Sequence, residues 1–308
     1  MPAAGPVQLA AAGWLRSSWH RRCSRRGVVR SITVIEPPSL TDLRLSTAIR
    51  RLLRERDLLR ALTAHRFKVR YKQSRLGIAW AVLQPLSMML VFTLMFAVLG
   101  RAPGGGVPYA VFAYAALVPW TAFAGGLSNA SSSLTSHAAL LTKVYFPREI
   151  LPLTYVLAAL ADMALASIAL VVLLAWYQIP LGPAALWGLL AIALMAAFLT
   201  GASLLLSAVQ VWHRDVSIAM PMLLQVWLFA SPVLYPLEGV RNALPDWLYV
   251  VYIMNPMAAV VDTFRRAIVL QQPPDFFALA VGALVTVSLL PAAYVYFKLG
   301  ERTMADSV

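Results

Sequence analysis

The chain has 308 residues, of which 60% are hydrophobic and 13% are charged, whereas a soluble globular domain averages roughly 45–50% apolar and about 25% charged residues. This composition excludes an ordinary soluble protein and indicates an integral membrane protein. The formal net charge is +13, but no recognised nucleic-acid-binding signature accompanies it, so the charge indicates a surface that faces anionic lipid.

The positive charge is concentrated at the start of the chain. Residues 1–78 hold 17 of the 26 Lys and Arg and 4 of the 13 acidic residues, so they carry the whole net charge. We expect residues 1–44 to form a weakly ordered cytoplasmic extension without a cleaved leader, because the arginines follow the first apolar residues instead of preceding them. Cys23 is the single cysteine, which excludes an intramolecular disulfide.

We expect residues 45–75 to form an amphipathic helix that lies in the membrane interface. In "TAIRRLLRERDLLRALTAHRFKVRYK", leucines such as Leu52, Leu59 and Leu62 recur at helical spacing, with arginines among them. An apolar stripe flanked by cations is typical of an interfacial helix. An ordinary soluble helix is the alternative, and the transmembrane segment that follows argues against it.

We expect residues 76–300 to form an all-α transmembrane domain. A helix rises about 1.5 Å per residue and needs about 20 apolar residues to cross a hydrocarbon core of roughly 30 Å. Five segments meet this length and the one that begins at residue 218 is near the lower limit, which gives six predicted spans: 79–99, 109–127, 151–177, 185–209, 218–235 and 276–297. Residues 301–308 follow as a cytoplasmic tail.

One further apolar piece, from Trp247 to Phe264, contains the break Asn255-Pro256 and the acid Asp262. Proline removes a backbone donor and biases the preceding residue away from the helical conformation. We therefore expect a re-entrant or interfacial helical hairpin, and the alternative is a seventh crossing that would place the C-terminus outside.

The distribution of Lys and Arg predicts the orientation. With six spans and both termini in the cytoplasm, 22 of these residues lie inside and 4 lie outside. Cytoplasmic loops of membrane proteins carry an excess of Lys and Arg, so the sequence predicts a cytoplasmic N-terminus, and a cytoplasmic C-terminus if the hairpin does not cross.

The enzymatic motifs are incomplete. The triplet His213-Arg214-Asp215 is similar to that of a kinase catalytic loop, but Met220 stands where such a loop requires Asn. The glycines of residues 104–106 lack the Lys-Ser/Thr of a phosphate-binding loop, and the four histidines are far apart in sequence. We expect no catalytic residue and no metal site.

Asp162 is a lone acid within the third predicted span. An ionised carboxylate at the centre of a membrane helix costs about 2.5–3.5 kcal/mol on insertion scales, so it needs a polar lumen, a partner or a proton. A role in lining a pathway and a role in pairing helices are both open.

The segment between the second and third spans, "SNASSSLTSHAALLTKVYFPREILP", has a Ser-rich start and a short amphipathic run from His137 to Tyr145. An apolar helix face with a cationic end is suited to a groove on a soluble partner. The alternative is that this run only lies on the membrane surface.

Six stretches occur in order with plausible spacing: "RYKQSRLGIAWAVLQP", "YAALVPWTAF", "LLTKVYFPREILP", "VWHRDV", "LFASPVLYP" and "NPMAAVVDTFRRAI". Together they resemble the membrane subunit of ABC-2 type exporters of bacterial cell-surface polysaccharides, the permeases for O-antigen, capsule and teichoic acid. The resemblance covers about residues 45–300. It implies six transmembrane helices, a gate helix at about Thr47 to Tyr71, a coupling helix at about His137 to Tyr145, and outer re-entrant helices at about Pro245 to Ile268.

The resemblance also implies the partners. Such a permease forms a homodimer in the bacterial inner membrane, binds two copies of a separate ABC ATPase, and exports a lipid-linked polysaccharide. ATP and Mg²⁺ are used by the ATPase, so this chain would bind no cofactor and would not be an enzyme. The wording of the motifs is closer to the O-antigen type, with teichoic acid and capsule permeases as alternatives.

Three sets of residues follow from the resemblance, together with Asp162 as an intramembrane polar residue. The candidates for the lipid pyrophosphate at the gate are cationic: Arg70, Lys72 and Arg75. The candidates for glycan contact in the channel are aromatic: Trp80, Trp120, Phe123, Trp227, Phe229 and Tyr235. The candidates for ATPase coupling lie around the coupling helix: His137, Leu140, Lys143, Tyr145, Phe146 and Arg148.

Two other classes of protein remain as alternatives. An integral-membrane glycosyltransferase would need clustered carboxylates at the interface, whereas Asp162 stands alone in its span. An ion-coupled secondary transporter would use several intramembrane charges and often repeated halves, and neither is evident.

Overall fold

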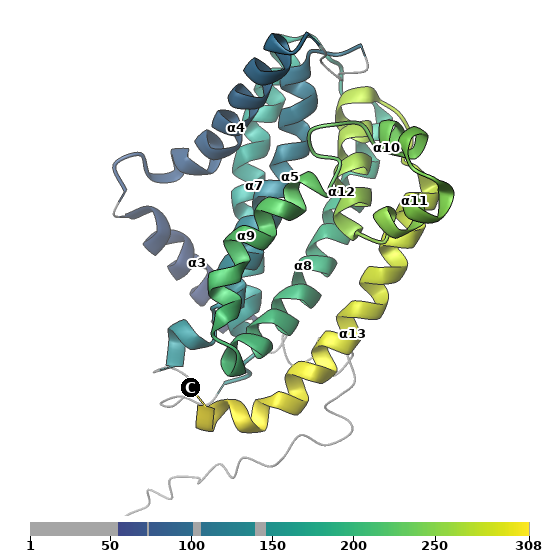
Figure 1. The fold of residues 1–308 in the computed structure, drawn as a ribbon. Helices are drawn as coiled ribbons and strands as arrows, with labels where there is room; N and C mark the ends of the chain where they lie inside the picture. Colours follow the sequence, from purple (N-terminus) through teal and green to yellow (C-terminus); the bar gives the residue numbers. More distant parts are fainter. Residues whose placement is uncertain (1–54, 73, 101–105, 139–145, 308) are drawn as a thin grey trace, which may run out of the picture. The chain divides into compact units, whose positions relative to one another are not determined.

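A computed structural model describes residues 55–72, 74–100, 106–138 and 146–307, all within one compact unit that runs from Pro38 to Val308. These residues form helices and turns, with no strand among them (Figure 1). The helices are α3 Arg56–Lys72, α4 Trp80–Val98, α5 Tyr109–Ser131, α7 Ile150–Trp176, α8 Leu186–Trp212, α9 Asp215–Phe229, α10 Leu237–Ala243, α11 Asp246–Ile253, α12 Pro256–Arg265 and α13 Phe276–Ser307.

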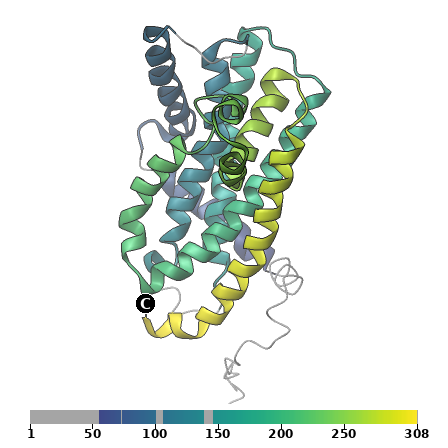
Figure 2. The same cartoon turned by 45° about the vertical axis from the view of Figure 1, so that its right-hand side comes forward.

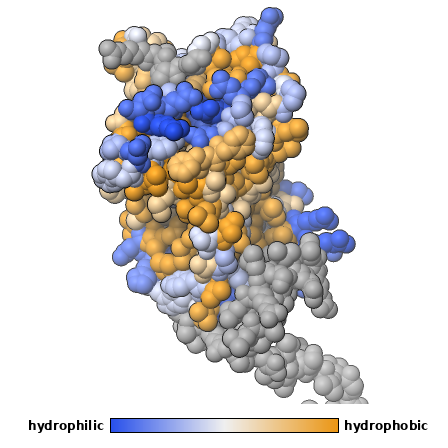
Figure 3. Space-filling model, turned by 90° about the vertical axis from the view of Figure 1, so that its right-hand side faces the viewer, coloured by the Kyte–Doolittle hydropathy of each residue, from blue (hydrophilic) through white to orange (hydrophobic). Residues whose placement is uncertain are grey.

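Five helical segments are long and apolar enough to cross a membrane: Gly77–Val98, Tyr109–Ser131, Ile150–Trp176, Pro183–Trp212 and Phe276–Glu301. They correspond to five of the six predicted spans. Hydrophobic side chains form a broad belt on the surface between more hydrophilic ends (Figure 3). A surface of this kind is stable only against lipid or another apolar surface.

The predicted span 218–235 is shorter in the structure. Its helix, α9, has 15 residues and ends at Phe229, a length of about 22 Å at about 1.5 Å per residue. Turns replace the helix from Ala230 to Tyr235. Pro232 explains the early end, because proline biases the residue before it away from the helical conformation.

The predicted break at Asn255-Pro256 is confirmed. The pair Asp246–Ile253 and Pro256–Leu270 is bent by 86°. Asn255 begins α12 as its N-cap, since its side chain accepts a hydrogen bond from the backbone N–H of Met257 at 3.1 Å. Pro256 occupies the first helical position, where the missing N–H has no cost.

The centre of the bundle is α5, which packs against α4, α7, α8, α9 and α12. Its close approach to α7 and α8 requires Gly126, because a Cβ atom there would lie 2.8 Å from the Cβ of Ala159. The first span, α4, lies at the periphery and leaves apolar side chains such as Val91, Leu94 and Val98 exposed. One whole helix therefore presents an apolar surface to its surroundings.

The last helix, α13, extends beyond the predicted span 276–297 and through most of the predicted tail, to Ser307. Its C-terminal turns pass beneath the other helices in two views (Figures 1 and 2). In this part of α13, Lys298 and Glu301 lie beside Glu149 and Arg148, just before the start of α7.

Candidate functional site

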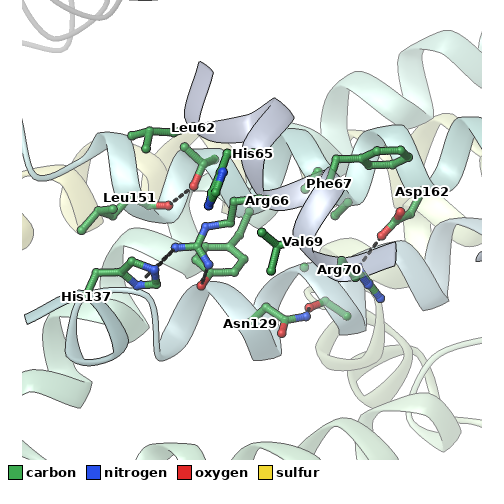
Figure 4. A pocket seen from close by; sticks show the side chains of 16 residues that line it. Leu62, His65, Arg66, Phe67, Val69, Arg70, Asn129, His137, Leu151 and Asp162 are labelled. Atoms are coloured by element: carbon green, nitrogen blue, oxygen red, sulfur yellow. Dashed lines mark hydrogen bonds and ion pairs between the residues drawn. The ribbon is translucent and has the colours of Figure 1, made fainter. Parts of the chain in front are cut away.

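A cavity of about 440 Å³ lies between α3, α5 and α7 (Figure 4). Small residues form part of its wall, including Gly125 and Gly126 on α5 and Ala158 and Ala159 on α7. The polar side chains that line it come from α3, α5 and α7, with His137 from the segment between α5 and α7. The cavity therefore lies where the predicted gate helix meets His137, the first residue of the predicted coupling helix.

Arg66 of α3 contacts the start of that segment. Its Nη2 lies 2.5 Å from Nε2 of His137, and Nδ1 of His137 lies 3.0 Å from the backbone oxygen of Ser133. The arrangement fits a neutral imidazole that donates from Nδ1 and accepts at Nε2. Burial, and then the positive charge of Arg66, lower the pKa of His137.

Arg66 also contacts α7 just beyond the segment. Its guanidinium carbon lies 3.9 Å from the centre of the Tyr155 ring, and it donates a hydrogen bond to the Tyr155 hydroxyl. Burial lowers the pKa of Arg66, but the reference value is so high that the side chain stays charged. One cation thus connects α3 to His137 in the segment and to Tyr155 on α7.

One helical turn further along α3, two side chains bind Asp162 of α7. Nη1 of Arg70 lies 2.5 Å from one carboxylate oxygen, and the Tyr71 hydroxyl donates to the other at 2.6 Å. Burial and the hydrogen bond to Asp162 raise the pKa of Tyr71, so the phenol keeps its proton at neutral pH. The geometry supports the helix-pairing interpretation of Asp162.

The three cations predicted for the gate therefore differ in their surroundings. Arg70 is paired with Asp162, whereas Lys72 and Arg75 are exposed and form no ion pair with any residue that the structure describes. Arg70 is also exposed, at 45% of its side chain, so the difference is the ion pair, which leaves Lys72 and Arg75 available to an anionic ligand.

Three of the residues predicted for ATPase coupling, Leu140, Lys143 and Tyr145, lie outside the described residues. Phe146 packs against a buried cluster that includes Leu151 and Phe297.

The last predicted coupling residue, Arg148, donates to the backbone oxygen of Glu301 at 2.7 Å. The following residue, Glu149, forms a buried ion pair with Lys298 at 2.8 Å. This pair was not predicted from the sequence, where an acid and a Lys stand at the ends of two predicted spans.

The aromatic candidates separate into buried and exposed residues. Trp120 and Phe123 are almost fully buried and form a cluster with Phe198 and Trp227, with ring centroids 5.2–6.5 Å apart. Trp227 is held by Asn255, whose Oδ1 accepts from its indole N–H at 3.0 Å.

Trp80 and Phe229 are about half exposed, at 49% and 53%. Tyr235 is partly buried and donates to the backbone oxygen of Phe229 at 2.6 Å. Within one chain, therefore, only Trp80 and Phe229 of the predicted set offer a large ring surface to a ligand.

A second buried charged cluster lies in the bent helix pair. Arg265 is 1% exposed and contacts Asp262 at 3.3 Å, the backbone oxygen of Pro232 at 2.9 Å and the face of Phe112 at 4.1 Å. Arg266 binds the same carboxylate at 2.7 Å. The i,i+3 and i,i+4 spacing of Asp262, Arg265 and Arg266 is the sequence signal for this cluster.

Among the described residues, no group of three or more His, Cys, Asp or Glu could hold a metal ion. The cavity and the charged clusters contain hydrogen-bonding groups and ion pairs. Their chemistry is suited to positioning helices and to contacting a ligand.

Comparison with known proteins identifies relatives. Residues 57–269 match the family model described as ABC-2 type transporter. The chain is 31% identical, over 84% of its own length and 98% of the relative's, to the O-antigen export system permease protein RfbA of Myxococcus xanthus. It is 28% identical to the protein of the same name from Klebsiella pneumoniae, over 68% of this chain and 79% of that one. It is 26% identical to the capsule polysaccharide export inner-membrane protein CtrC of Neisseria meningitidis, over 73% and 84%.

Proposed function

Because the chain belongs to the ABC-2 type transporter family, we propose that it is the membrane subunit of an ATP-driven exporter that moves a lipid-linked polysaccharide of the O-antigen type out of the cytoplasm. The observation that carries the proposal is the 31% identity over 98% of the length of an O-antigen export permease. The capsule export relative is less similar, at 26% identity.

The chain is a transport subunit of the inner membrane and has no ATPase role of its own. ATP and Mg²⁺ are bound by a separate ABC ATPase, of which two copies join a homodimer of this chain. The exposed apolar face of α4 supports this assembly, because a second copy that covered it would create a shared path between two protomers. Both termini lie in the cytoplasm, as the concentration of Lys and Arg supports.

The substrate enters at the C-terminal end of α3. Lys72 and Arg75 attract the pyrophosphate of the lipid carrier at the cytoplasmic leaflet, where each cation contributes about 1 kcal/mol near the surface. Trp80 and Phe229 then contact the apolar faces of sugar rings with their exposed ring surfaces. Residues 137–148 bind the ATPase, with Leu140, Lys143, Tyr145 and Phe146 as the proposed contacts.

The test is deletion of the gene followed by analysis of the surface glycan. We expect loss of an O-antigen-type polysaccharide from the surface, its accumulation on a lipid carrier in the cytoplasm, and co-purification of the tagged permease with an ABC ATPase. Loss of a capsular polymer or teichoic acid with the O-antigen intact would reassign the substrate. Glycan synthesis by the purified chain without an ATPase would refute the proposal.

A further inference from the structure

Arg66 joins parts of the chain that are far apart in sequence. It lies on α3 and contacts His137, the first residue of the segment proposed to bind the ATPase, and Tyr155, the sixth residue of α7. On the premise of the proposed function, we infer that Arg66 is a positioning residue that transmits movement of this segment to α3 and so to the substrate entrance.

The way α3 is attached makes such transmission possible. The cavity of about 440 Å³ lies on the face that α3 turns toward α5 and α7, and apolar side chains of α3 such as Leu62 and Val69 line it. The links across this face are polar and lie at two levels, one at Arg66 and one where Arg70 binds Asp162 (Figure 4). The Tyr71 hydroxyl adds a second hydrogen bond to Asp162. A helix held by a few polar links beside a cavity can shift when one link is displaced.

The contacts of Arg66 also indicate how a displacement of the segment would reach α3. The planar guanidinium lies on the Tyr155 ring and donates to its hydroxyl, while Nη2 donates to the imidazole of His137. His137 is the first residue of the segment, and its other nitrogen contacts the backbone oxygen of Ser133. A displacement of the segment at His137 therefore moves the group that accepts the hydrogen bond from Arg66. Lysine would keep the charge but lose the fork that reaches both partners.

The inference predicts a loss of coupling without a loss of assembly. We would reconstitute the full-length permease and its ATPase in membrane vesicles and measure glycan export, ATP hydrolysis and the amount of bound ATPase. Arg66→Gln should lower the glycan exported per ATP hydrolysed by about tenfold, within the usual range for coupling between sites. Bound ATPase should stay at the wild-type level.

Lys68→Gln is the matched control, because it removes one positive charge from the same helix at an exposed position that forms no ion pair within the described residues. It should leave the ratio of export to hydrolysis unchanged. The double variant Arg66→Gln with His137→Gln should be no worse than Arg66→Gln alone, since both remove the same link.

Wild-type coupling in Arg66→Gln, an equal loss in Lys68→Gln, or multiplied losses in the double variant would overturn the inference. If Arg66→Gln does not assemble, Arg66→Lys and Tyr155→Phe replace it, and unchanged coupling in both would be equally decisive against the inference. Failure of the proposed function is distinct, because the wild-type vesicles would then export no glycan.

Discussion

Cations that look alike in sequence have different roles at the start of the membrane domain. Arg66 and Arg70 are bound by side chains of the bundle, whereas Lys72 and Arg75 are exposed. The first pair fixes α3 and the second pair is free to contact lipid phosphate. A lone charge inside an apolar span, Asp162, is explained by the same contacts, because α3 supplies both a cation and a hydroxyl to it.

Replacing Asp162 with Asn tests this pairing. The variant should lower the free energy of unfolding by about 1–2 kcal/mol, since it removes a hydrogen bond between charged groups while Arg70 stays partly solvated. Denaturant unfolding of the purified protein measures the change. In the Asp162→Asn background, Arg70→Gln should lower the free energy of unfolding by no more than a substitution at an exposed position does. Full additivity of the two losses in free energy would contradict the pairing.

The state of His137 predicts a dependence on pH. Because its pKa lies below the ordinary value of 6.5, the unfolded chain takes up the proton first as the pH falls. The stabilisation is therefore present above about pH 6.5 and is lost as the pH falls from there toward the lower folded pKa. The charged group that contacts the imidazole is Arg66 on α3. The titratable residues His65, Tyr155 and Asp162 line the same cavity.

The corresponding measurement is the Tm of the purified protein between pH 7.5 and pH 5.5. The Tm should fall on acidification, and the fall should be smaller in His137→Gln, which keeps a polar side chain but does not titrate in this range. The difference between the two proteins isolates His137 from the other histidines. An identical pH profile would show that His137 is not linked to folding.

At the scale of elements, α5 holds the bundle together because its neighbours approach closely. Gly126 faces Ala159 of α7 and Leu199 of α8, and a Cβ atom there would lie 2.8 and 2.9 Å from their side chains. The adjacent Gly125 has no atom within 4 Å of the corresponding position. A side chain at position 126 would therefore overlap the neighbouring helices, whereas there is space for one at position 125.

This difference gives a matched pair of variants. Gly126→Ala should destabilise the protein by about 1–3 kcal/mol, the usual cost of overpacking a well-packed core. Gly125→Ala should be neutral or stabilising by up to about 1 kcal/mol, because Ala has the higher helix propensity. Thermal or denaturant unfolding of the two variants side by side provides the check, and equal effects would contradict the packing of α5 on α7.

At the scale of the whole molecule, the side of the membrane on which the C-terminus lies depends on whether the bent helix pair crosses. Five long helices cross by length and composition, α9 is short, and the pair from Asp246 to Leu270 is bent by 86°. Our proposal counts α9 as a crossing and the bent pair as re-entrant. Both termini then lie on the basic, cytoplasmic side.

Reporter fusions after Val308 test this topology. A green fluorescent protein fused there should fluoresce, and an alkaline phosphatase fused there should be inactive, because that enzyme folds only outside the cytoplasm. A phosphatase fused after Gly106, between the first two spans, is the control and should be active. The opposite pattern at Val308 would mean that the number of crossings is odd.

The sequence by itself determined the class of the protein, five of its long helices, the break at Asn255-Pro256 and the family. These properties follow from local chemistry: the length of apolar runs, the missing N–H of proline, the position of cations and short motifs that are contiguous in the chain. The early end of α9 also has a local cause, Pro232, although the predicted span ran past this residue to 235.

Only the tertiary structure decided which side chains meet. Asp162 is 92 positions from Arg70, Lys298 is 149 from Glu149, and the rings of Trp120 and Trp227 pack against each other. An aromatic or charged residue in an apolar helix has the same local sequence signal whether it faces lipid, a channel or the core. The direction it faces depends on how the helices pack, because helix–helix contacts are made by residues far apart in sequence.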